Sequence, residues 1–281
     1  MLTGEHAAIA RMLTLVERRA GGVDTAITML HQHTGSAHVI GVTGPAGSGK
    51  STLVAALTAH YRGEGRSVGV LAVDPSSVLS GGALLGDRIR MSALAGDNGV
   101  YIRSLATRGA LGGLSRATLD AITVLDAAGK DAVILETVGA GQAEVDVVGA
   151  AHTVAVVSVP GMGDEVQANK ASLLEIADVH VVNKSDRAGA AKTVAELRAT
   201  IRLSHSRAGQ WNVPVQQTVA LDRGRRGRTG HPPHRASGLD DHAWRAWPTG
   251  PSQQRSPDSL DGPAAGRRPV AAWLAGIRTC A

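Results

Sequence analysis

"GVTGPAGSGKST", residues 41–52, sets the architecture expected of this chain. It joins a short apolar run to a stretch with the length of a helix. Residues 44–51 fit the pattern G-x-x-x-x-G-K-[ST], in which glycines let the backbone wrap around phosphates and a lysine reaches the β- and γ-phosphates. The sequence therefore predicts a phosphate-binding loop, with contacts to a nucleotide from Gly44, Pro45, Ala46, Gly47, Ser48, Gly49, Lys50, Ser51 and Thr52.

From residue 38 to residue 220, short runs rich in Val and Ile alternate with helix-length stretches. Runs that are apolar on both faces and joined by helices indicate a mostly parallel sheet covered on both sides. We therefore predict an α/β fold, a three-layer P-loop NTPase domain over residues 38–220. The expected strands are 38–43, 68–73, 100–105, 132–136, 153–159, 179–183 and 213–219, and the expected helices include 50–62, 115–129, 165–177 and 188–203.

The segments on either side of this domain have a different character. Residues 1–37 show apolar residues at helical spacing, interrupted at Gly21 and Gly22, and are predicted to form a helical extension of two helices. Residues 221–281 hold seven of the 11 prolines and are rich in Arg and Gly. This composition predicts a disordered tail. Two alternatives remain open, a shifted reading frame that replaces the native continuation and a dedicated RNA-binding tail.

Charge and apolar patterning limit the partners and the location of the protein. Ten of the 29 Lys and Arg residues and five of the 24 Asp and Glu residues follow Ala220, so the charges of residues 1–220 balance. The body therefore offers no general attraction for nucleic acid. We expect no nucleic-acid partner, no membrane partner and a cytoplasmic location, since there is no long apolar stretch, no signal-peptide order and a single cysteine.

The segment Asn183-Lys184-Ser185-Asp186 follows an apolar run and predicts which base is bound. Guanine exposes its N1–H and N2–H₂ donors together, and the Asp186 carboxylate can accept both. Adenine offers no such pair and would leave the carboxylate unpaired, so the site discriminates strongly. We expect Lys184 to lay its methylenes along the base and Asn183 to tie this segment to the phosphate loop. The predicted ligands are GTP and GDP.

Four side chains with oxygen atoms are candidate ligands for Mg²⁺. The Ser51 hydroxyl has this role in the phosphate-loop motif. Glu136 ends an apolar run just before Gly139, where P-loop proteins hold the acid that senses the γ-phosphate, and the Gly139 N–H would face that phosphate. Asp74 and Asp87 could reach Mg²⁺ directly or through water. As alternatives, Asp74 could cap a turn and Asp87 could be a solvated loop charge.

Several segments in a fixed order carry a family resemblance: VDPSS, GGALLGDRIRM, ETVGAGQAEVD, PGMGDEVQANKA and ADVHVVNKSDR. Over residues 8–220 the chain resembles the ArgK/MeaB family of P-loop GTPases. The resemblance implies a GTP-hydrolysing chaperone that gates cofactor loading and protects a cobalamin-dependent acyl-CoA mutase, such as methylmalonyl-CoA mutase, alone or with its adenosyltransferase. It also implies a third switch that reports the nucleotide state to the mutase, formed by Asp164, Glu165, Gln167 and Lys170.

The resemblance stops after Ala220. In the family a Gly-containing loop over the guanine follows this point, and then come the C-terminal helices that build a homodimer. Ala220 keeps the start of that loop, where its N–H would meet guanine O6. The residues beyond it do not match. This departure favours the shifted-frame alternative, and it predicts weakened dimerisation and weakened nucleotide affinity.

The predicted reaction is Mg²⁺-assisted attack of water on the γ-phosphate of GTP, with Lys50, Glu136 and Gly139 as the catalytic set. No side chain matches the Gln or Arg of a fast, self-sufficient hydrolase, so we expect slow intrinsic turnover that the partner stimulates. The main alternative is an ATP-dependent kinase or ATPase associated with lysine, arginine and ornithine transport, which predicts adenine preference. A third is a non-catalytic adaptor that only binds nucleotide and partner.

Three histidines, His31, His33 and His38, lie close together in the sequence. With no cysteine nearby and a position at a helix end, they are predicted to form a solvated cluster and not a metal site.

Overall fold

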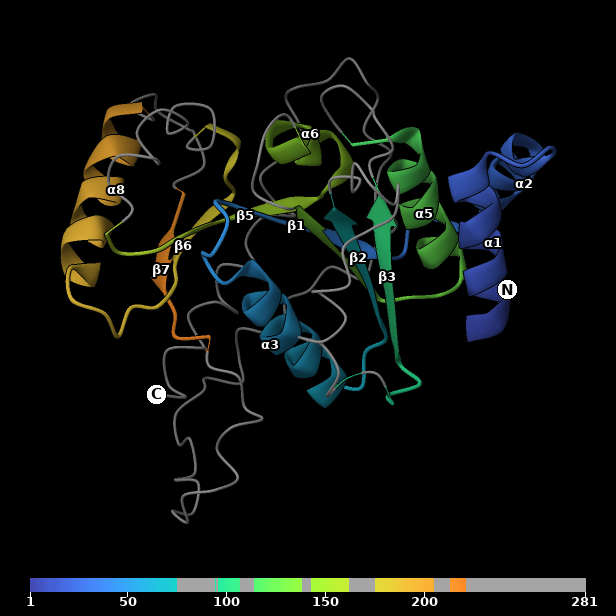
Figure 1. Ribbon diagram of the computed structural model, residues 1–281, viewed down its shortest axis with the longest axis horizontal. Helices are drawn as coiled ribbons and strands as arrows, with labels where there is room; N and C mark the ends of the chain where they lie inside the picture. Colours follow the sequence, from blue (N-terminus) through green and yellow to red (C-terminus); the bar gives the residue numbers. More distant parts are fainter. Residues whose placement is uncertain are drawn as a thin grey trace, which may run out of the picture.

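The computed structural model describes residues 1–74, 94, 96–106, 114–137, 143–161, 175–204 and 213–220. One parallel sheet with the strand order β3-β2-β4-β1-β5-β6-β7 runs through the middle of the molecule (Figure 1). Each expected apolar run forms a strand, so the predicted α/β class is confirmed. The strands are β1 (His38–Thr43), β2 (Val68–Asp74), β3 (Val100–Ala106), β4 (Ala132–Thr137), β5 (Thr153–Ser158), β6 (Val179–Val182) and β7 (Val215–Gln217).

The helices include both members of the predicted N-terminal pair. Most of the helix expected at 165–177 and the whole predicted tail, 221–281, fall outside the described residues. Within the described ranges, no helix has the length and apolarity needed to cross a lipid bilayer. The helices are α1 (His6–Arg18), α2 (Val23–Leu30), the 3-10 turn η1 (His31–His33), α3 (Lys50–Gly63), α5 (Arg116–Ala127), α6 (Ala143–Ala150) and α8 (Ala190–Ser204).

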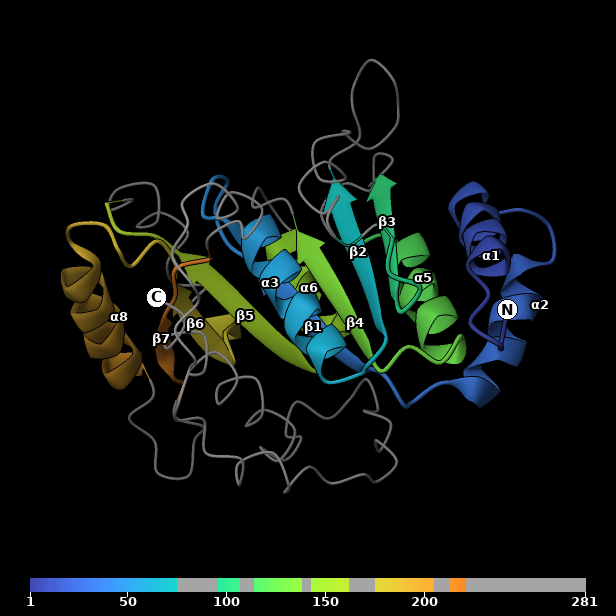
Figure 2. The ribbon, with the colours of Figure 1, turned by 90° about the horizontal axis from the view of Figure 1, so that it is seen from below.

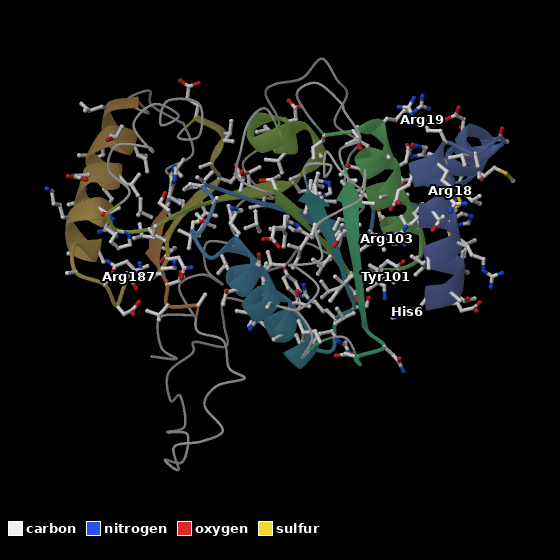
Figure 3. All side chains as sticks on the ribbon, in the orientation of Figure 1. His6, Arg18, Arg19, Tyr101, Arg103 and Arg187 are labelled. Atoms are coloured by element: carbon white, nitrogen blue, oxygen red, sulfur yellow. The ribbon has the colours of Figure 1, made fainter. Side chains whose placement is uncertain are left out.

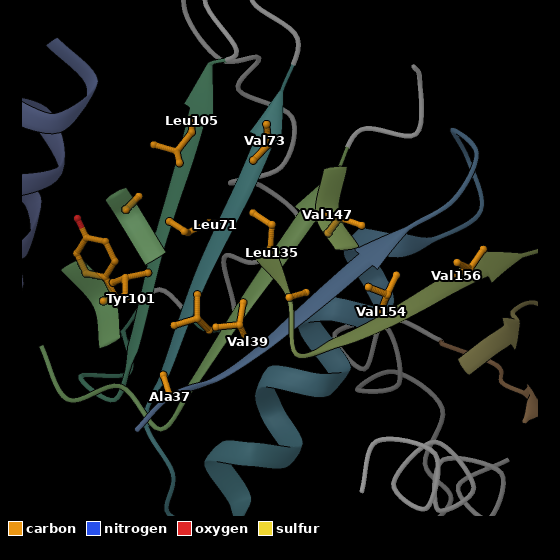
Figure 4. Packing of buried hydrophobic residues seen from close by; sticks show 14 of the residues in the cluster. Ala37, Val39, Leu71, Val73, Tyr101, Leu105, Leu135, Val147, Val154 and Val156 are labelled. Atoms are coloured by element: carbon orange, nitrogen blue, oxygen red, sulfur yellow. The ribbon is translucent and has the colours of Figure 1, made fainter. Parts of the chain in front are cut away.

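The central strands bury side chains on both faces of the sheet, which is why they read as unbroken apolar runs. On β1, Val39 lies in a cluster with residues of α5, α6 and α8 (Figure 4). Its neighbour Ile40 lies in the second cluster, with residues of α3. Successive strand residues point to opposite faces, so the two clusters form the two interfaces of a three-layer P-loop domain.

The N-terminal helices share the core of this domain. Ile9, Leu13 and Val16 of α1 are buried in the same cluster as residues of α5 and β3. Arg103 of β3 also donates to α1, from Nε to Glu17 Oε1 at 2.9 Å. Figure 2 shows α1 and α2 at the β3 end of the sheet and α8 at the β7 end.

The carboxylate of Asp126, near the end of α5, holds the chain just before β1. It accepts the backbone N–H groups of Gly35 at 2.7 Å, Ser36 at 3.2 Å and Ala37 at 2.9 Å. Asp126 is buried, so these bonds satisfy a charge that would otherwise be costly to remove from water. They set where β1 begins, and β1 leads directly into the phosphate loop.

The prediction of a solvated histidine cluster is wrong for His38. Its side chain is half-buried, and its Nε2 lies 3.1 Å from Thr153 Oγ1 of the neighbouring strand. Burial, with smaller contributions from His152 and Arg66, lowers the pKa of His38 to about 4. The predicted strand does begin at His38, but local composition could not show that Thr153, 115 positions later, lies beside its side chain. Among the described residues, no group of three or more His, Cys, Asp or Glu side chains could hold a metal ion.

Candidate nucleotide-binding site

The predicted phosphate loop lies between β1 and α3, in the expected strand–loop–helix setting. Gly44 has φ +134°, a backbone conformation that side chains disfavour. A Cβ at this position would also collide with the carbonyl of Val157 on β5. Helix α3 begins at Lys50, so its first N–H groups lie at the loop, where the helix end favours an anion.

Lys50 is folded against the backbone of its own loop. Its Nζ donates to the carbonyls of Gly44 at 2.7 Å and Pro45 at 3.0 Å, and the residue is only 6% exposed. The ammonium group therefore already lies at the loop, and phosphate oxygens entering there would offer it charged acceptors that bind more strongly than neutral carbonyls.

Ser51 and Glu136, 85 positions apart in the sequence, meet because β4 pairs with β1 in the sheet. The Ser51 Oγ donates to Glu136 Oε1 at 2.6 Å, and both residues are buried. Two adjacent ligands of an octahedral Mg²⁺ are about 2.9 Å apart. The spacing and the hard oxygen atoms of this pair therefore fit the ion. Asp74 ends β2, the strand beside β4, and so lies at the same edge of the sheet.

Sequence reasoning missed a second side-chain pair at this edge. Thr137 Oγ1 donates to Thr43 Oγ1 at 2.9 Å, and both hydroxyls are buried. Thr43 directly precedes the phosphate loop, and Thr137 directly follows Glu136. The bond therefore joins the last residues of β1 and β4. The two threonines are 94 positions apart, so no local pattern could have paired them.

The expected tie between the base-binding segment and the phosphate loop is present. Asn183 Nδ2 donates to the carbonyl of Ser48 at 2.9 Å, and Lys184 Nζ donates to the carbonyl of Gly47 at 2.8 Å. A Cβ at Gly49, where φ is +90°, would collide with Asn183 Nδ2, so the close approach requires glycine there.

The segment after β7 joins the same network through Asn183. The Asn183 Oδ1 accepts from Thr218 Oγ1 at 3.3 Å and from the N–H of Ala220 at 3.1 Å. The N–H of Ala220, predicted to meet guanine O6, thus has a protein acceptor in this structure, and O6 would have to share or replace it. The predicted base-reading residue Asp186 is exposed on the same loop.

The structure gathers most predicted site residues along the carboxyl edge of the sheet, from the end of β2 across the central strands β4 and β1 to the segments that follow β6 and β7. Figure 3 shows Arg187, which follows Asp186, far from Arg18, Arg19 and Arg103 at the N-terminal side. The remaining predicted residues, Asp87, Gly139, Asp164, Glu165, Gln167 and Lys170, lie outside the described residues.

A parallel sheet with a phosphate loop bonded to an Asn-Lys-Ser-Asp segment defines a P-loop protein of the GTPase type. Comparison with known families agrees with this class. The family model described as methylmalonyl Co-A mutase-associated GTPase MeaB matches residues 9–227, and the chain belongs to this family.

Relatives of known sequence and structure support the assignment. The chain is 52% identical over 218 residues to a protein of Pyrococcus horikoshii named as a candidate GTPase, covering 77% of this chain and 69% of that protein. It is 40% identical over 187 residues to the GTPase ArgK of Escherichia coli, covering 65% of this chain and 56% of the relative. A crystal structure of an LAO/AO transport system kinase is 28% identical, with a TM-score of 0.61, covering 78% of this chain and 67% of that one.

A third relative by sequence is named after methylmalonic aciduria and not as a GTPase. The chain is 34% identical over 232 residues to the Mus musculus protein named methylmalonic aciduria type A homolog, mitochondrial. The match covers 76% of this chain and 56% of the mouse protein.

Proposed function

We propose that this chain binds GTP and GDP together with Mg²⁺, hydrolyses GTP slowly, and acts as a chaperone of a cobalamin-dependent acyl-CoA mutase such as methylmalonyl-CoA mutase. The nucleotide part rests on one observation, the bond from Asn183 Nδ2 to the carbonyl of Ser48. This bond holds a phosphate loop and a guanine-type segment together as one site. The mutase part is supported by the family description, which names an association with methylmalonyl-CoA mutase.

The proposed roles follow from where the side chains lie. Lys50 would exchange the carbonyls of its own loop for the β- and γ-phosphates of GTP. Ser51 and Glu136 would hold Mg²⁺, since they already present two oxygen atoms at a suitable spacing. When bound, the ion would neutralise charge on the phosphates during attack by water. Because none of these residues activates the water, intrinsic turnover would be slow.

Base selection would come from the carboxylate of Asp186 and the N–H of Ala220. The exposed carboxylate can accept the paired N1–H and N2–H₂ donors of guanine. The name of the similar solved structure, an LAO/AO transport system kinase, would favour the alternative of an ATP-dependent transport kinase. It is not favoured, because the E. coli relative is named a GTPase and because an Asp at this position disfavours adenine.

Calorimetric titration with Mg·GDP and, in parallel, Mg·ADP tests the guanine site. We expect binding of GDP and at least tenfold weaker binding of ADP. The variant Asp186→Ala should narrow this preference, and Asp24→Ala, a change of an exposed carboxylate on α2, serves as the control. Equal affinity for both nucleotides, or tighter binding of ADP, would overturn the proposal.

Phosphate release from GTP, measured with and without purified methylmalonyl-CoA mutase, tests the chaperone role. Slow release that the mutase accelerates supports it, and an unchanged rate with no complex on gel filtration contradicts it.

The same gel filtration, with light scattering, tests the expected weak dimer. A cytoplasmic location remains part of the proposal, and so do the absence of a nucleic-acid partner and the absence of a membrane partner.

A further inference from the structure

Ser185 is the one residue of the segment 183–186 that has no role in the proposed guanine site. It makes two hydrogen bonds to a single acceptor. Its backbone N–H donates to the carbonyl of Thr218 at 3.1 Å, and its Oγ donates to the same carbonyl at 3.0 Å. Both donors come from the base-binding segment, and the acceptor lies 33 positions later in the chain, just after β7.

This carbonyl sets the orientation of a peptide group close to the base site. The carbonyl of Thr218 belongs to the planar peptide that joins Thr218 to Val219. Once that plane is held, only the two backbone dihedrals of Val219 separate it from the N–H of Ala220. Ser185 therefore restricts the directions open to the Ala220 N–H without touching it, and the bond from this N–H to Asn183 Oδ1 selects one of them.

Few other contacts hold this stretch of backbone within the described residues. Strand β7 ends at Gln217, and the sheet contributes one further bond, from the N–H of Thr218 to the carbonyl of Val182 at 2.9 Å. The Thr218 hydroxyl bonds to Asn183 Oδ1 at a longer 3.3 Å. The paired donors of Ser185 are thus a main restraint on the carbonyl side of Thr218.

We infer that Ser185 is a positioning residue for purine recognition, one that holds the Ala220 N–H toward the 6-position of the base and thereby selects a 6-oxo purine. This inference rests on the proposed guanine site. A 6-oxo group offers an acceptor to this N–H, alongside the oxygen of Asn183 that already accepts it at 3.1 Å. A 6-amino group would place donor against donor, which leaves both without a partner.

The test compares three ligands on the full chain by calorimetry: GDP, 6-thioguanosine diphosphate and IDP. The 6-thio analogue keeps the donors at N1 and N2 but replaces O6 with sulfur, a weak acceptor. IDP keeps O6 but lacks the 2-amino group that Asp186 would bind. The ratio of GDP to 6-thio affinity thus reports the Ala220 contact, and the ratio of GDP to IDP affinity reports the Asp186 contact.

Ser185→Ala should weaken GDP binding by roughly two- to tenfold, the effect of one hydrogen bond, and should narrow the GDP to 6-thio ratio by the same factor. The GDP to IDP ratio should stay unchanged. Ser185→Thr keeps a hydroxyl and should restore the GDP to 6-thio ratio. The matched control is Ser67→Ala, which removes a serine hydroxyl that donates to the carbonyl of Gly129 at the amino end of β2, away from the site.

Equal loss for all three ligands, an unchanged GDP to 6-thio ratio, or failure of Ser185→Thr to restore it would overturn the inference. A wild-type chain that binds neither GDP nor IDP would instead refute the proposed function. Should Ser185→Ala not fold, Ser185→Cys, with its weaker donor, takes its place and should narrow the same ratio by a smaller factor.

Discussion

The substitution Asn183→Ala should destabilise the protein even when no nucleotide is present. Asn183 is 1% exposed and makes three side-chain bonds, to Ser48, Thr218 and Ala220. Alanine would leave the Ser48 carbonyl and the Thr218 hydroxyl without these partners in a buried site. Ala220 is only half-buried, so its N–H is left out of this sum.

Each buried polar group left unpaired costs about 1–3 kcal/mol, so two such groups predict a loss of roughly 2–6 kcal/mol in the free energy of unfolding. The assay is urea unfolding of the nucleotide-free chain, followed by circular dichroism. Thr218→Val, which removes one of the three bonds, is the graded control and should cost about 1 kcal/mol.

Urea unfolding without nucleotide and the affinity for GDP, measured on the same variant, show whether the bonds of Asn183 exist in the free protein or form only when nucleotide binds. Lower stability without nucleotide means that the phosphate loop and the base-binding segment are joined in the free protein. Unchanged stability together with weaker GDP binding would refute this reasoning, because the bonds would then form only when nucleotide binds.

Three further outcomes can be measured. Glu136→Gln should raise the Mg²⁺ concentration needed for GTP hydrolysis by roughly tenfold to hundredfold, since it removes the charge beside Ser51, and an unchanged Mg²⁺ dependence would contradict the magnesium assignment. Asp126→Ala should lower the free energy of unfolding by about 3 kcal/mol in urea, because three N–H groups at residues 35–37 lose their acceptor, and Asp126→Asn should cost less. The folded pKa of His38 is about 4, below its unfolded value of 6.5, so the unfolded state binds the proton first. The contribution of His38 to the free energy of unfolding should be full above pH 6.5 and fall by up to roughly 3 kcal/mol toward pH 4. The difference in unfolding free energy between the wild type and His38→Gln, measured in urea, should change over this pH range, and a constant difference would contradict the prediction.

The sequence was most informative where structure depends on neighbours along the chain. The phosphate loop and α3 follow from glycines at set spacings before a helix-forming stretch, and both lie where they were expected. The seven strands were recognisable because strands buried on both faces must be apolar without interruption. Helix α6 was not singled out, since the apolar residues of its sequence AEVDVVGA do not gather on one helical face, whereas those of the equally short α2 do.

His38 and Asp126 show where this reasoning fails. Both are ordinary polar residues in their local sequence, and nothing nearby reveals that the side chain of His38 packs beside Thr153 or that Asp126 holds residues 35–37. Their environments come from chain segments about 90 or more positions away, Thr153 for His38 and residues 35–37 for Asp126. Burial and pairing of a polar side chain are properties of the packed fold.

The amino-acid sequence was sufficient for the fold class, the strand positions, the phosphate loop and the guanine-type segment, because each depends on residue types at short spacing. Strand order and register emerged only in three dimensions. Strands pair through backbone N–H and C=O groups that nearly all residues share, so the residue types do not state which strands pair. Through that order Ser51 meets Glu136, Thr43 meets Thr137, and Ser185 meets Thr218. Long-range packing therefore turned separate motifs into one site.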